Sequence, residues 1–480
     1  MKNSKIYKSL QKLSIYELNR FDKFIRSPYF NQNEKLIAYF EVLVQYLKNK
    51  KEGEIDKNEI WKNISEKDEF NDLKFRKYTS DLLKLFERFL AQQIYDDNNL
   101  QIANNLLANV SRKRITNLYN SVLSTAERLS ERHLDRNSDY YYSQYNFEKN
   151  KFNLTSEFEK KSKKKSKYNW LNIDKMGENL DVFFISEKLK LYNTLLSWKR
   201  VYQLDIELNF IDEVIEFVNK IEYEKYPPIA IWYQIYIAVK EVDNIEHYFK
   251  LKEMIKNYIN TFPKEEAMDI FESALNYCIR KINTGKSEFF NEIFTLYNTM
   301  IENAMIIDEE GMDPTRFRNI VITALRIKEF DWAEGFIEKY SEYIPEKYRE
   351  NAVTFNLARL YFHKKDYSKV IEYLRDVEFD DMVYELSSKQ MLIATYYDTD
   401  EYTPLYSLLD SFSVFLNRHK RTIPENRRKN YKLFIKFVKK LLNISPRDKV
   451  ALKKLKKQIE DAGNIPDKKW LIQRVEELGV

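Results

Sequence analysis

Cysteine is almost absent from this 480-residue sequence, which contains only Cys278. One cysteine cannot form a disulfide within the chain, so disulfide-rich secreted domains are excluded and a reducing compartment is favoured. Glycine and proline are also scarce, with 7 and 10 residues. Folds rich in β-structure need a turn about every ten residues. The scarcity of chain-breaking residues therefore favours long helices joined by short turns.

Long hydrophobic segments are missing as well. The longest uncharged stretch, residues 226–239, is shorter than the roughly 20 residues that a membrane-spanning helix needs. The first 21 residues carry charges throughout and contain no apolar run followed by small residues, so no signal peptide is predicted. We expect a cytoplasmic protein with no membrane insertion.

Patterns typical of catalytic or metal sites are also lacking. The four histidines, His133, His247, His363 and His419, are never three or four residues apart, the spacing that places two metal ligands on one helical face. No two glycines lie close enough to form a phosphate-binding loop. Cys278 lies in an apolar helical context that favours a place in the core. We therefore expect no enzyme activity, no cofactor and no metal.

Helical signals, in contrast, begin near the N-terminus. Ser14 and Glu17 form the sequence pattern of a capping box, and Pro28 predicts that the helix ends at Ser27. Apolar residues between these points repeat at helical spacing. Further helices are predicted over residues 33–50, from residue 56, and over residues 73–93 and 179–198. The fold class predicted is all-α.

The order of these signals predicts four segments. Residues 1–135 are expected to form an N-terminal helical domain of irregular design. Residues 136–262 are expected to form helical hairpins with an exposed basic loop at residues 160–167, where lysines repel one another. A repetitive α-solenoid follows at residues 263–463. Residues 464–480 are predicted to be a C-terminal capping helix.

A repeat emerges from about Pro314 onward. Residues 356–374 contain a leucine and a small residue, a tyrosine three positions later, a tight turn and a second helix, which resembles one tetratricopeptide unit. Weaker copies lie upstream and downstream. Ala333, Val370 and Leu405 occupy matching positions and are 37 and 35 residues apart, near the period of about 34 residues in that family. The pattern predicts hairpins stacked into a tetratricopeptide-like, right-handed α-solenoid.

A second resemblance extends over most of the chain. The segments at residues 13–18 and 24–31, residues 179–190 and residues 228–233 resemble a family of uncharacterised bacterial tetratricopeptide-like helical-repeat proteins of unknown function. The resemblance implies a helical-repeat fold and a cytoplasmic location, and it implies no known activity.

Tetratricopeptide stacks often bind peptides along the concave side, which the first helix of each hairpin lines. Transfer of the binding positions onto this sequence predicts a groove formed by Arg318, Asn319, Arg326, Asn356, Arg359, His363 and Gln390. The carboxylate clamp known in that family is not expected, because Ile322, Ser387 and Met391 replace residues that it requires.

The strongest electrostatic feature lies near the C-terminus. Residues 417–457 contain sixteen basic and two acidic residues, a net charge of +14, so the rest of this +6 chain has a net charge of −8. Helical spacing predicts a basic face formed by Lys429, Lys432, Lys436, Lys439, Lys449, Lys453, Lys456 and Lys457. This face could bind nucleic acid or an acidic partner, close the solenoid as a polar cap, or pair with the acidic residues 376–401.

Taken together, these patterns favour a non-enzymatic scaffold or adaptor that binds a protein or peptide. One alternative is a protein that associates with nucleic acid or an acidic partner through the basic face. Another is a peptide-sensing regulator, which would need an output domain that the sequence does not reveal.

Overall fold

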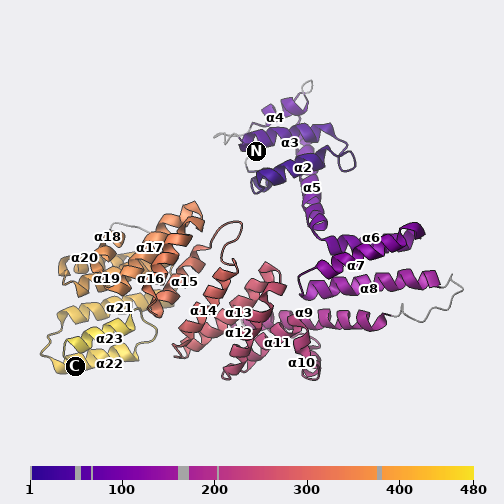
Figure 1. Ribbon diagram of the computed structural model, residues 1–480. Coiled ribbons are helices and arrows are strands. Elements are labelled where there is room, and N and C mark those ends of the chain that lie inside the picture. Colours follow the sequence, from indigo (N-terminus) through magenta and orange to yellow (C-terminus); the bar gives the residue numbers. More distant parts are fainter. Residues whose placement is uncertain are drawn as a thin grey trace. The chain divides into compact units, whose positions relative to one another are not determined.

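The computed structural model describes residues 3–48, 56–65, 69–159, 172–202, 205–375 and 381–479. Over these ranges the chain forms 23 α-helices and short 3₁₀ turns, and the β-type contact there is one isolated bridge between Asp308 and Gly311. The predicted all-α class is therefore confirmed (Figure 1). None of the helices in the described ranges has the length and apolar character to cross a bilayer. The predicted basic loop at residues 160–167 lies outside the described residues.

The chain divides into two compact units. The first comprises residues 1–236 and 258–263, and the second comprises residues 237–257 and 264–480. The first unit contains these helices: α1 (Lys5–Leu10), α2 (Ile15–Arg26), α3 (Glu34–Lys48), α4 (Lys57–Ile64), α5 (Asp72–Asp97), α6 (Asn99–Lys113), α7 (Tyr119–Arg132), α8 (Ser138–Glu159), α9 (Ile173–Tyr202) and α10 (Ile211–Val218), with α11 (Pro227–Lys240) continuing into the second unit.

An aromatic core holds the beginning of the first unit together. Phe21 of α2 is fully buried, with ring centroids of Phe40, Phe86 and Phe89 at 4.9, 5.4 and 5.1 Å. The capping box is confirmed, since the Ser14 hydroxyl accepts from the backbone N–H of residue 17 at 3.2 Å and the carboxylate there accepts from the N–H of Ser14 at 2.8 Å. Further along, α6 packs on α7 and α8, and α8 packs on α9.

The second unit consists of helical hairpins. Its helices are α12 (Glu246–Tyr258), α13 (Lys264–Asn283), α14 (Phe289–Glu302), α15 (Pro314–Arg326), α16 (Phe330–Tyr340), α17 (Glu346–Lys364), α18 (Tyr367–Leu374), α19 (Met382–Asp398), α20 (Tyr402–Arg418), α21 (Glu425–Asn443), α22 (Lys449–Asp461) and α23 (Lys468–Glu477). Within each hairpin α15–α16, α17–α18 and α19–α20 the two helices pack together, and α17 also packs on both α15 and α19.

The turns of these three hairpins are alike. Lys328, Lys365 and Asp400 all have left-handed backbones, with φ of 66°, 61° and 58°. In each turn the next N–H donates to a carbonyl five residues earlier, at 2.9 Å in all three cases. This is the hydrogen bond of a Schellman motif, which ends a helix and turns the chain back. The three turns are 37 and 35 residues apart, the same spacing as the repeat positions Ala333, Val370 and Leu405, each of which is fully buried.

Candidate functional site

Three arginines gather on the first helices of consecutive hairpins. Arg318 and Arg326 lie two turns apart on α15, and Arg359 and His363 lie one turn apart on α17, so each pair occupies one side of its helix. We call these four residues the arginine face. Gln390 of the neighbouring α19 lies beside the arginine face, since it interacts with Asp467, a carboxylate that Arg359 and Arg326 also influence.

A pair of aromatic rings supports two of the arginines. Phe355 of α17 and Tyr384 of α19 stack with centroids 4.4 Å apart and an interplanar angle of 15°. The guanidinium of Arg359 lies 5.0 Å from the Phe355 centroid, and that of Arg318 lies 5.7 Å from the Tyr384 centroid. Cation–π attraction at these distances stabilises the charged guanidinium groups although they are partly removed from water. The stack also fixes the two arginines relative to each other.

Burial and neighbouring positive charges disfavour the protonated forms of Arg359 and His363. Burial is the main cause that lowers the pKa of Arg359 to about 10, and the charges of Arg326 and Arg318 add to it. Burial, followed by Arg326 and Arg359, lowers the pKa of His363 to about 4. At neutral pH the histidine is therefore uncharged, whereas Arg359 remains charged. A site that gathers guanidinium groups in this way favours an anion.

One carboxylate of the chain itself approaches the arginine face. Asp467, the residue before α23, accepts a hydrogen bond from Gln390, and the charges of Arg359 and Arg326 stabilise its ionised form. Burial has the larger effect and raises the pKa of Asp467 above its ordinary value. Its Oδ2 is buried without a hydrogen-bond partner, and no ion pair of the described residues joins it to an arginine.

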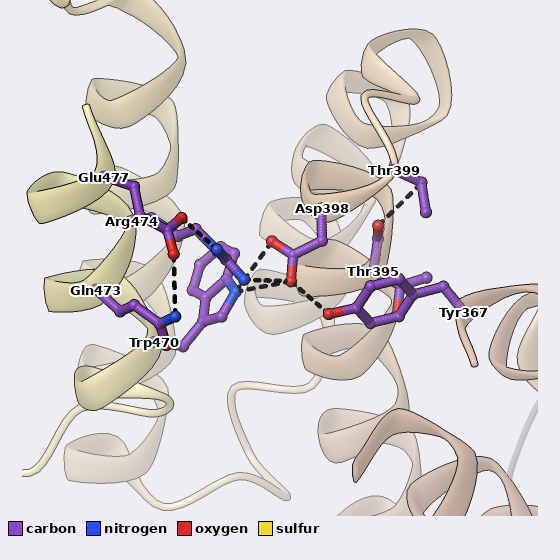
Figure 2. A network of polar contacts seen from close by, with 8 residues as sticks. All are labelled: Tyr367, Thr395, Asp398, Thr399, Trp470, Gln473, Arg474 and Glu477. Carbon is purple, nitrogen blue, oxygen red and sulfur yellow. Dashed lines mark hydrogen bonds and ion pairs between the residues drawn. The ribbon is translucent and has the colours of Figure 1, made fainter. Parts of the chain in front are cut away.

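Helix α23 is anchored beside this carboxylate by a second polar cluster, which Figure 2 shows from close by. Asp398, at the end of α19, is paired with Arg474 of α23 at 2.7 Å between Oδ2 and Nη2. The Trp470 indole donates to the same carboxylate at 3.3 Å, and the Tyr367 hydroxyl donates to it at 2.8 Å. The Arg474 guanidinium also pairs with Glu477. These contacts join α23 to α18 and α19.

The structure separates the seven residues of the predicted groove into two groups. Five of them gather on or beside the arginine face, namely Arg318, Arg326, Arg359, His363 and Gln390. Asn356 is fully buried and donates to the carbonyl of Ala352 in its own helix at 2.7 Å. Asn319 is exposed on α15. The sequence analysis missed Asp467 and the aromatic support, because both depend on contacts between different helices.

The predicted basic face is partly neutralised. Lys429, Lys439 and Lys456 form ion pairs of 2.7, 2.6 and 2.7 Å with nearby carboxylates, and Lys432 donates to Asn417 at 2.6 Å. The other four lysines are exposed and form no ion pair within the described ranges: Lys436, Lys449, Lys453 and Lys457. The ion pairs seen in the described part of residues 376–401 do not involve the basic face, since Asp398 pairs with Arg474 and Glu385 with Lys389.

In the part of the chain that the structure describes, no group of three or more His, Cys, Asp or Glu side chains could hold a metal ion. Cys278 of α13 is fully buried, and burial raises the pKa of its thiol to about 12. No protein-family model matches the chain, and no curated protein is significantly similar to it in sequence. Function therefore has to be inferred from the residues of the chain itself.

Proposed function

We propose that this chain is a non-enzymatic, cytoplasmic scaffold for protein–protein interaction. In this proposal the hairpins from α15 onward stack into a tetratricopeptide-like, right-handed α-solenoid whose first helices present the arginine face to a protein or peptide partner. The observation that carries the proposal is the gathering of Arg318, Arg326 and Arg359 on the neighbouring helices α15 and α17. The repeated left-handed turns and buried repeat positions support the solenoid.

The chemistry of arginine explains why such a face would bind a partner. A guanidinium is planar, keeps its charge and can donate two parallel hydrogen bonds to one carboxylate. The guanidinium groups of Arg359 and Arg318 already lie over aromatic rings, 5.0 and 5.7 Å from the ring centroids. Their side chains are therefore partly ordered before a partner arrives, which lowers the entropy lost on binding.

The proposal can be tested by affinity capture from a native lysate. Full-length wild type is compared with a variant carrying Arg318→Glu and Arg326→Glu and with a control carrying Lys436→Glu and Lys453→Glu. Both variants change the net charge equally, but only the first alters the arginine face. We expect a protein partner to be retained by wild type and control and lost from the arginine variant. Equal retention by all three proteins would contradict the proposal.

A second candidate function is supported by the four exposed lysines of the basic face. Lys436, Lys449, Lys453 and Lys457 could neutralise phosphates of a nucleic acid, with a strong dependence of binding on salt concentration. Retention on heparin or DNA that disappears when these four lysines are changed to glutamate would favour this function. If wild type is not retained at low salt, this candidate is excluded.

A further inference from the structure

Helix α23 runs beside α19 in the same direction. Asp467 is bonded to Gln390, and seven residues later Arg474 is paired with Asp398, which lies eight residues after Gln390. At 1.5 Å per residue, both intervals correspond to about 10–12 Å of helix. The two contacts are therefore the same distance apart on α23 as on α19. The Asp398–Arg474 pair therefore fixes the far end of α23, and the beginning of α23 places one carboxylate at the arginine face.

The fit between Asp467 and the arginine face is poor. Its Oδ2 is buried without a hydrogen-bond partner, and it forms no ion pair in the described part of the chain. It occupies the position that caps a helix, yet its side chain makes no capping bond to α23. Its backbone lies in the left-handed region, at φ 44° and ψ 37°, which aspartate adopts less readily than glycine but more readily than most other residues. Asp467 therefore stabilises the charged arginines only by electrostatic attraction, without a direct hydrogen bond to them.

We propose that the arginine face recognises the carboxylates of an acidic peptide, and that Asp467 with α23 occupies this site as an internal competitor that the peptide displaces. The inference rests on the function proposed above and adds the chemistry of the partner. The charge balance is its basis, since the face gathers three guanidinium groups and one carboxylate of the chain, Asp467, acts on two of them, those of Arg359 and Arg326. A peptide with several carboxylates can neutralise all three and accept the direct paired hydrogen bonds from a guanidinium that Asp467 does not accept.

Displacement follows from the same contacts. An incoming carboxylate that bonds Arg359 directly competes for the arginines that now act on Asp467, while Gln390 loses its acceptor. Helix α23 then retains its packing on α21 and α22 and, at its far end, the pair between Asp398 and Arg474. The strength of that pair would set how much of the binding energy is used to release the helix.

The probe for a test is a fluorescently labelled hexaglutamate peptide, with hexaglutamine as the uncharged control. Binding to the full-length chain is followed by fluorescence anisotropy at low salt. We expect hexaglutamate to bind and hexaglutamine not to bind. Arg359→Gln should weaken binding by about tenfold or more, as should Arg326→Gln, an exposed position that tolerates the change even if Arg359→Gln impairs folding. Lys436→Gln, which removes a charge from the basic face, should leave the affinity within about twofold.

Two variants test the internal competitor. Asp467→Asn should bind hexaglutamate about three- to tenfold more tightly, because the competing carboxylate is gone. Arg474→Gln gives a sharper test, because it removes a positive charge. Attraction between net charges alone predicts weaker binding of an acidic peptide, whereas release of α23 from Asp398 predicts tighter binding. In wild type, addition of hexaglutamate should also speed hydrogen exchange in α23.

The outcomes separate the inference from the proposed function. If the arginine variants weaken binding but Asp467→Asn and Arg474→Gln do not tighten it, Asp467 is not a competitor and the inference is wrong while the scaffold proposal stands. If Lys436→Gln weakens binding as much as Arg359→Gln does, the peptide is attracted by general charge and the arginine face is not its site. If hexaglutamate does not bind, the inference that the partner is acidic is wrong. The scaffold proposal is then decided separately, by capture of a partner from lysate.

Discussion

Asp398 and Arg474 form an ion pair across 76 residues of sequence, with 2.7 Å between Oδ2 and Nη2. Their side chains are 5% and 17% exposed. Trp470 and Tyr367 donate to the same carboxylate, so both of its oxygens accept hydrogen bonds. Because one acidic side chain satisfies three donors from two other segments, it joins α23 to α18 and α19, in addition to the packing of α23 on α21 and α22 (Figure 2).

We expect Asp398→Asn to release α23. The substitution keeps the shape of the side chain but leaves the largely buried Arg474 guanidinium with only the half-exposed Glu477 as counter-charge, a change that costs up to about 3 kcal/mol. Because α23 packs mainly on two helices, α21 and α22, the loss should appear as local opening before global unfolding. Hydrogen exchange measured by mass spectrometry should show loss of protection over Lys468–Glu477.

A matched control is available on α21. Lys429 and Glu425 also form a 2.7 Å ion pair, but their side chains are 68% and 65% exposed. Lys429→Gln should therefore leave the stability almost unchanged. If the two substitutions produced similar changes in exchange, burial would not be the reason for the strength of the Asp398–Arg474 pair.

His363 should make the folded state sensitive to acid. Burial and the nearby charges of Arg326 and Arg359 lower the pKa of His363 to about 4, below the ordinary value of about 6.5. Between these pH values the unfolded chain binds a proton that the folded chain does not. Stability is therefore fully present above about pH 6.5 and is lost as the pH falls toward 4, by at most about 3 kcal/mol.

The His363→Gln variant isolates this contribution. Asp467 has a raised pKa, so its own effect on stability has the opposite sign at acidic pH, and the total curve mixes the two groups. Urea unfolding of wild type and His363→Gln at pH 7 and pH 4.5 gives the difference that belongs to the histidine. We expect wild type to lose more stability than the variant on acidification. Parallel losses would show that His363 does not resist protonation.

The sequence predicted the helical elements well, because their signals are local. The capping box at Ser14 and Glu17 formed as its spacing indicates, and Ser27 ends α2 before the proline. The repeat positions Ala333, Val370 and Leu405 are all buried. Each of these outcomes depends on residues within one or two turns of helix, or on a period that recurs along the chain.

Contacts between distant helices could not be predicted in the same way. Asp467 precedes a helix, where an aspartate ordinarily caps the helix, yet its carboxylate bonds to Gln390 of α19 instead. Asn356 has the residue type and position of a groove residue, but it is fully buried and bonds within its own helix. Neither the contact of Asp467 nor the burial of Asn356 follows from a periodic pattern in the sequence. Both depend on which helices pack against the arginine face.

Cys278 should be inert in the folded protein. Its side chain is fully buried in α13, and burial raises the pKa of the thiol to about 12, so almost no thiolate is present near pH 8. We expect reaction with Ellman's reagent to be at least about a hundredfold slower before denaturation than after it. A variant carrying Cys278→Ala and Ser411→Cys, with the new thiol at an exposed position of α20, should react at once. Rapid reaction of native wild type would contradict the burial of this residue.

The left-handed turns of the repeats can be tested through one substitution made at two places. Lys328 ends the first hairpin turn with φ of 66°, where a side chain costs about 1–2 kcal/mol. Lys328→Gly should relieve this strain and, after the extra entropy of glycine in the unfolded chain, stabilise the protein by about 0.5 kcal/mol. Lys454→Gly makes the same change at an exposed position inside α22, where the helical backbone is unstrained, and should cost about 1 kcal/mol. Opposite shifts in the urea midpoint would show that the turn geometry, and not the loss of a lysine, decides the sign; shifts of the same sign would exclude a left-handed backbone at residue 328.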